Sequence, residues 1–170
     1  RQVKSEEYQE LVENQQAVWH VVEQIEKLDE QLAALRTEEN QIENTIASLQ
    51  PWKALDIPVE TSSTRNVTFL LGTIPALVNL EELVEELYNT VPESYLKIIN
   101  KDRDQNYLFV TYYNKREDEV MSLLRGHGFS KVTFKDLTGT IQENLDQANE
   151  QLNAIAAKRE ETEKDIAEFA

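Results

Sequence analysis

A heptad repeat runs through the first fifty residues and constrains the fold more than any other feature of the chain. With Leu11 taken as position a, ten of the twelve a and d positions up to Leu49 are apolar. This spacing of about 3.5 residues places the apolar side chains in one narrow stripe, which a second helix must cover. No glycine or proline occurs before Pro51. The sequence therefore predicts a single helix over 11–49, roughly 60 to 70 Å long.

The chain supplies a partner for that stripe near its other end. From Ile141 to Phe169, apolar residues recur in alternating steps of four and three, and seven of the nine positions are apolar. We expect the two helices to form an antiparallel coiled coil within one molecule, with pairing between two copies as the alternative. The predicted seam contains Val18, Val21, Ile25, Leu28, Leu32, Leu35, Ile42, Leu145, Leu152, Ile155 and Ile166.

The periodicity between the two helices is that of a small α/β domain. Strands are predicted at 67–73, 95–100, 107–113 and 129–135, with helices at 79–91 and 114–125. The order β-α-β-β-α-β is that of a ferredoxin-like domain, in which the first strand enters and the last strand leaves at the same end. The predicted fold class is therefore α+β, a long antiparallel two-helix coiled coil capped by a ferredoxin-like βαββαβ domain.

Three segments follow from this pattern. Residues 1–50 form the outgoing helix, 51–140 the α/β lobe with its connector, and 141–170 the returning helix. Pro51 ends the first helix and Pro58 keeps the next residues extended, so 51–65 is the connector. We expect Trp52 to be buried where elements meet, because large aromatic side chains usually are. Trp19 lies off the seam, and we expect it to contact another stretch of protein.

The charge of the chain argues against nucleic acid as a partner. The net charge is −15, of which residues 1–50 contribute −7 and residues 141–170 contribute −5. A phosphate backbone would be repelled by such helices, so the acidity is best explained as a solvated helix surface. The sequence contains no cysteine and no run of about 18 apolar residues.

No catalytic pattern is present. The chain has two histidines and lacks the nucleophile-elbow, P-loop and dinucleotide-binding motifs. Asp102, Asp104 and Asn106 match the opening of a calcium loop, but Tyr107 replaces the required glycine and Tyr113 the bidentate glutamate. We therefore expect no enzymatic activity, no cofactor, no metal ion and no small-molecule substrate.

One alternative is an RNA- or ligand-binding ferredoxin-like domain on a coiled-coil stalk. Residues 105–112 partly fit the third-strand signature of an RNA-recognition motif, in which Tyr107 and Phe109 would stack on bases, with Phe69 beside them. Gln105 and Asn106 stand where that motif has a basic residue and glycine. The fit is therefore incomplete, and the acidic charge opposes it.

Four segments carry a resemblance to a known family. Residues 49–58 (LQPWKALDIP), 69–75 (FLLGTIP), 128–134 (GFSKVTF) and 137–140 (LTGT) resemble subunit I of bacterial and archaeal V/A-type ATPases, the homologue of eukaryotic subunit a. The resemblance covers about residues 45–145. It implies that the chain is a cytoplasmic α/β lobe, the one distal to the membrane centre, with its supporting coiled coil.

The resemblance also implies a function. The family's lobes bind the E and G subunits of the peripheral stalk and hold the stator of a rotary ion-transporting ATPase against rotor torque. The ion-translocating membrane half is absent from this chain, so we expect membrane contact only through that missing domain, on the cytoplasmic side. The predicted partner-binding residues lie on the sheet face left free by the two helices of the lobe, with Trp19 in addition: Tyr95, Lys97, Ile99, Tyr107 and Phe109.

Overall fold

The structure is a computed structural model and describes residues 2–61 and 63–169. The chain divides into two compact units, one formed by residues 1–45 with 148–170 and the other by residues 46–147. Within the described residues, no helix is both long and apolar enough to cross a bilayer.

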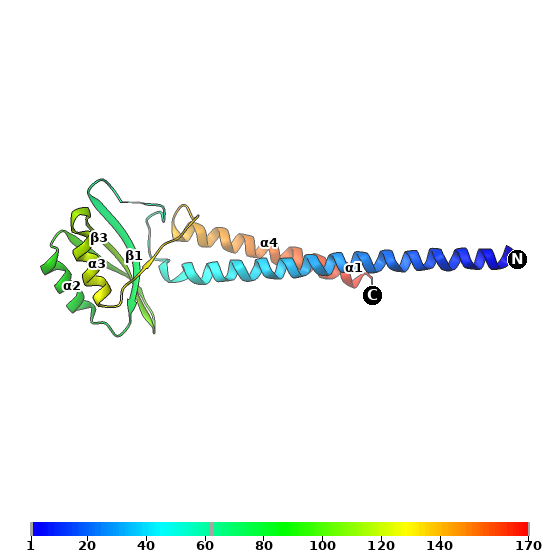
Figure 1. The fold of residues 1–170 in the computed structure, drawn as a ribbon, viewed down its shortest axis with the longest axis horizontal. Helices are drawn as coiled ribbons and strands as arrows, with labels where there is room; N and C mark the ends of the chain where they lie inside the picture. The colour runs from blue at the N-terminus through cyan, green and yellow to red at the C-terminus, as the bar shows by residue number, and fades with distance from the viewer. Residues whose placement is uncertain (1, 62, 170) are drawn as a thin grey trace. The chain divides into compact units, whose positions relative to one another are not determined.

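The first unit consists of helical segments from the two ends of the chain. Helix α1 spans Gln2–Leu49 and helix α4 spans Ile141–Ala167. Within this unit, α4 lies beside the C-terminal part of α1, and the N-terminal part of α1 extends beyond the end of α4 (Figure 1). Arg159 of α4 forms an ion pair with Glu39 of α1, and Glu163 lies 3.9 Å from Arg36. The residue numbers fall on one helix as they rise on the other, so the segments are antiparallel. The long N-terminal helix expected from the heptads is confirmed.

The start of α4 is fixed by a reciprocal pair of hydrogen bonds. The hydroxyl of Thr140 accepts from the backbone N–H of Glu143 at 3.1 Å, and the Glu143 carboxylate accepts from the Thr140 N–H at 3.2 Å. This capping box satisfies donors that would otherwise be unpaired at a helix N-terminus. The helix therefore begins where the repeat predicts.

The second unit is built on a four-stranded antiparallel sheet (Figure 1). Its strands are β1 (Val67–Pro75), β2 (Ser94–Lys101), β3 (Gln105–Tyr113) and β4 (Ser130–Val132), in the spatial order β2-β3-β1-β4. Helix α2 (Leu80–Thr90) connects β1 to β2, and helix α3 (Glu117–Gly126) connects β3 to β4. Short 3-10 turns occupy η1 (Gln50–Trp52) and η2 (Asn114–Arg116).

Two predicted elements differ from those in the structure. The last strand, expected at 129–135, covers only Ser130–Val132, and the turn between it and α4 contains Asp136 and Gly139 at positive φ angles of 62° and 83°. The helix expected from residue 114 begins with the 3-10 turn η2. Helix α2 is capped at its N-terminus by the Asn79 side chain, which accepts from the N–H groups of Glu81 and Glu82.

Each face of the sheet carries its own hydrophobic core. On one face, alternate residues of β1 and β3 pack against Leu83 and Leu87 of α2 and against Val120 and Leu124 of α3. On the other face, a second core contains Leu49, Trp52, Leu55, Tyr107, Ile141 and Leu145. Alternation along a strand sends neighbouring side chains to opposite faces, which is why one sheet can serve both cores.

Candidate partner-binding site

The register of the sheet places the predicted binding residues on one face. Lys97 of β2 lies opposite Phe109 of β3, and Tyr95 lies opposite Thr111. Ile99 falls at an irregularity in the pairing, between Ile98 and Asn100. The structure therefore brings these strand residues together as the alternation suggested.

That face is not free, however, and the expectation of an open sheet face was wrong. Tyr107 is only 8% exposed and meets Trp52 edge-on, with 5.3 Å between ring centroids. Ile99 and Phe109 are partly buried against the same core. Residues of the connector (51–65) and the adjoining ends of α1 and α4 cover the face. Of the predicted set on the sheet, Tyr95 and Lys97 keep exposed side chains. The burial expected for Trp52 is confirmed.

The side chain of Tyr107 is fixed both by the contact of its ring with Trp52 and by a hydrogen bond from its hydroxyl. Its hydroxyl donates a 2.6 Å hydrogen bond to Asp102, which also accepts from the backbone N–H groups of Asp104 and Gln105 at 2.8 Å. The bond to Asp102, together with burial, raises the pKa of Tyr107 to about 12. The same three hydrogen bonds lower the pKa of Asp102. Asp102 thus organises the β2–β3 turn.

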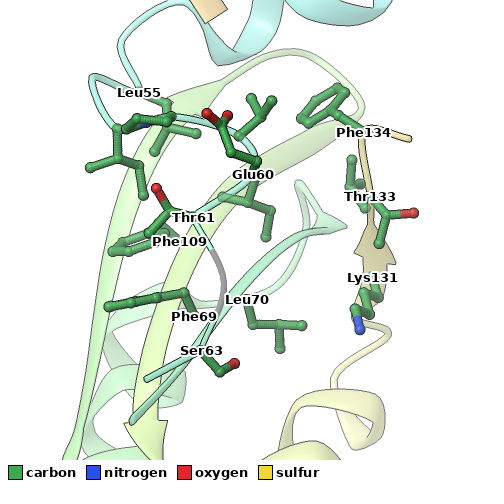
Figure 2. Close-up of a pocket in the computed structure, with 15 residues that line it drawn as sticks. Leu55, Glu60, Thr61, Ser63, Phe69, Leu70, Phe109, Lys131, Thr133 and Phe134 are labelled. Carbon is green, nitrogen blue, oxygen red and sulfur yellow. The ribbon is translucent and has the colours of Figure 1, made fainter. Parts of the chain in front are cut away.

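A cavity of about 320 Å³ lies between the connector and this sheet face (Figure 2). Phe69 and Phe109 stack on one another at its wall, with 5.9 Å between centroids and 15° between planes. Glu60 and Lys131 are the charged residues in its lining, and both are exposed. The aromatic rings that an RNA-recognition motif would offer to bases are thus in contact with one another or buried.

The connector is fastened to the turn before α4. The Glu60 carboxylate accepts from the Gly139 N–H at 2.7 Å, and the Val59 N–H donates to the Gly139 carbonyl at 2.8 Å. A Cβ at Gly139 would lie 2.3 Å from the Glu143 carboxylate, and φ is positive there. Glycine is therefore required where the connector and the capping box of α4 meet.

The remaining predicted residues lie on the helices. Trp19 and Val18 are exposed on α1, at 65% and 62%, and Val21 is at 36%. Leu35 and Ile155 are buried in the helical unit, and Leu145 is buried in the second core of the lobe. Partly buried positions complete the seam list: Ile25, Leu28, Leu32, Ile42, Leu152 and Ile166.

The lobe also has an exposed apolar surface on helix α2 that was not predicted from the sequence. Val84 of α2 is 41% exposed, and Tyr88 is 65% exposed. The signal was present, because Leu80, Val84 and Tyr88 are four residues apart and form a stripe beside Leu83 and Leu87.

Among the comparisons with known proteins, the one with solved structures found similar proteins. No family model matches the sequence, and no curated protein matches it. Among solved structures, the fold is similar to the cytoplasmic N-terminal domain of subunit I, the homolog of subunit a, of V-ATPase. The two share 14% sequence identity with a TM-score of 0.56 over 85% of this chain. The match covers 48% of the other chain, so this chain spans about half the length of that domain.

Proposed function

We propose that this protein is a stator component of a rotary V/A-type ATPase, a cytoplasmic lobe that docks the peripheral stalk and couples it to the membrane domain. The observation that carries the proposal is the similarity in fold to the cytoplasmic domain of V-ATPase subunit I. The motifs at 49–58, 69–75, 128–134 and 137–140 support it, because the resemblance in sequence and the similarity in fold point independently to one family.

The proposal includes a finer description of the fold. The strand order β2-β3-β1-β4 and the element order of the lobe suit a ferredoxin-like domain over residues 51–140. Residues 1–50 and 141–170 form the two arms of an antiparallel coiled coil, in which the ion pair between Glu39 and Arg159 fixes the register. Paired helices resist bending better than one helix, which is what a stator requires.

In this role the chain has partners but no substrate. The lobe binds the E and G subunits of the peripheral stalk, and the ion-translocating half of the parent subunit supplies the link to the membrane. The chain works on the cytoplasmic side and has no catalytic part in ATP hydrolysis or synthesis. Tyr95 and Lys97 are the exposed members of the binding surface predicted from the sequence.

A binding titration tests the proposal. Isothermal titration calorimetry of the full chain against the E/G heterodimer encoded in the same genome is expected to give saturable binding. The alternative, RNA binding, predicts instead that single-stranded RNA binds at low salt and weakens as salt rises. Absence of E/G binding under conditions where RNA binds in that salt-dependent way would overturn the stator assignment.

A further inference from the structure

The lobe carries an apolar groove beside an edge strand that no described element covers. Its floor combines Leu80, Val84 and Tyr88 of α2 with Ile98 of β2. Glu81 and Glu85 of α2 rim one side, and Lys101 of β2 rims the other. We call this surface, with a volume of about 570 Å³, the α2/β2 groove.

Exposed apolar residues of the lobe are concentrated around this groove. Among the described residues of the 46–147 unit, the large apolar side chains that are exposed are Leu77, Val84, Tyr88, Tyr95 and Ile98. All five belong to α2, β2 or the loop that precedes α2. Three of them line the groove. A clustered apolar surface on a soluble domain typically marks an interaction site.

The groove is not an extension of the core. Leu83 and Leu87 of α2 are 0% and 2% exposed and fill the space between helix and sheet. Val84 and Tyr88 each follow one of these buried residues by one position and therefore lie on a neighbouring stripe, outside the core. Neither residue packs within the clusters of buried side chains that make up the two cores. Core packing explains Leu80, which packs against the first core, but not why Val84 and Tyr88 of the same stripe are apolar.

The edge strand favours a helix over an added strand as the occupant. Strand β2 pairs only with β3 among the described strands, so its outer edge is free. Its pairing is irregular between Ile98 and Asn100, and such a bulge disturbs the regular hydrogen-bonding edge that an added strand needs. A helix needs no backbone partners and can lay an apolar ridge into the groove.

The charges at the rim specify the flanks of that helix. The side chains of Glu81, Glu85 and Lys101 make no ion pair within the described part of the chain, whereas the nearby Glu86 bonds to His127. The acidic rim complements Lys or Arg, and Lys101 on the opposite rim complements Asp or Glu. Charges placed in this way set orientation and select among partners.

We propose that the α2/β2 groove binds an amphipathic helix of the peripheral stalk, with a basic flank against α2 and an acidic flank against β2. This inference rests on the proposed function and names the surface through which it operates. It places binding on the helical side of the sheet, away from the face that the connector covers. The groove offers an aromatic anchor, Tyr88, of the kind that dominates interface energetics.

The test compares tyrosine variants in calorimetric titrations of the full chain with the E/G heterodimer. Tyr88→Ala removes the groove residue, and Tyr8→Ala is the matched control, since Tyr8 is 70% exposed on α1, outside the lobe. Tyr95→Ala reports on the opposite face of β2, where Tyr95 is 58% exposed. We expect Tyr88→Ala to weaken binding by about tenfold or more and Tyr8→Ala by less than about twofold. Glu81→Lys with Glu85→Lys is expected to weaken binding by a comparable factor. Unchanged circular dichroism and melting temperature verify that each variant is folded.

Each outcome decides between the two proposals. If the wild type binds E/G and Tyr88→Ala binds equally well, the groove proposal is overturned and the stator role is retained. If only Tyr95→Ala loses E/G binding, the interface lies on the opposite face of β2, which also overturns the groove proposal. Absence of E/G binding by the wild type overturns the stator role and the groove with it. If the wild type self-associates in sedimentation equilibrium and Tyr88→Ala abolishes this self-association, the groove binds a second copy of the chain and the inference is overturned.

Discussion

Glu39 and Arg159, the charged residues that interrupt the apolar stripes of α1 and α4, form an ion pair with each other. Their side chains are 18% and 36% exposed, so the pair is partly shielded from water. Each charge would be costly in its stripe without the other, since a partly buried charge needs a partner. The two charged exceptions in the repeats are therefore one feature, and they select the antiparallel register.

Reversing one charge of this pair is expected to destabilise the helical unit. Arg159→Glu places carboxylates at 39, 159 and 163 close together and should cost about 1 to 2 kcal/mol. The double variant Glu39→Arg with Arg159→Glu should recover most of that loss. Urea unfolding followed by circular dichroism gives the coupling energy, and a double variant no more stable than the single one would refute the pairing.

Trp52 is the largest fully buried side chain and belongs to the second core of the lobe. Trp52→Ala should reduce the free energy of unfolding by about 3 to 5 kcal/mol, because it leaves a cavity beside Tyr107 and Phe134. Trp19→Ala is the control, as its side chain is exposed, and a change within about 0.5 kcal/mol is expected. Equal effects of both substitutions in urea titrations would contradict the burial of Trp52.

Gly72 is required by close packing between β1 and its neighbours. A Cβ at this position would lie 2.1 Å from the ring of Phe129 and 2.6 Å from the carbonyl oxygen of Ser130. Gly72→Ala is therefore expected to destabilise the lobe by about 1 to 3 kcal/mol. At Gly126 no atom lies within 4 Å of such a Cβ, so Gly126→Ala should be neutral or stabilise by up to about 1 kcal/mol. Melting temperatures of the two variants test the contrast.

Two tyrosines are expected to titrate late. The bond to Asp102 and burial raise the pKa of Tyr107 to about 12, and burial followed by the bond to Glu117 raises the pKa of Tyr112 to about 12. An ordinary tyrosine has a pKa of 10.0. The neutral phenols of Tyr107 and Tyr112 therefore make their full contribution to the free energy of unfolding below pH 10, and this contribution is lost as the pH rises toward 12.

The tyrosinate absorbance of the folded protein measures this titration. Part of the signal from the six tyrosines should rise with an apparent pKa well above 10.0. Tyr107→Phe should remove part of the late fraction and flatten the loss of stability between pH 10 and 12. Simultaneous titration of all tyrosines near pH 10, with the protein still folded, would contradict both assignments.

Local signals in the sequence predicted much of the fold. The uninterrupted heptads predicted α1, and the helical periodicity at 79–91 predicted α2, because each signal acts through residues close in the chain. The strands of the β2–β3 hairpin were likewise evident from their alternation. The N-terminus of α4 followed from the first apolar residue of the repeat, Ile141.

The candidate site could not be predicted in the same way. The burial of Trp52 was expected, but the connector has no period, so the sequence did not indicate that Trp52 and Leu55 would cover this face of the sheet. Tyr107 consequently appeared available on a strand where it is buried. The exposure of Val84 and Tyr88 is a tertiary property that helical spacing alone does not fix.

The chain of contacts from Asp102 through Tyr107 to Trp52 gives the lobe a built-in optical probe. A ligand or mechanical load that disturbs the β2–β3 turn shifts the ring of Tyr107, because Asp102 of that turn holds its hydroxyl. That ring contacts the indole of Trp52, which is shielded from water. Emission from Trp52, recorded in a Trp19→Phe background, will therefore register strain at the turn without any attached dye.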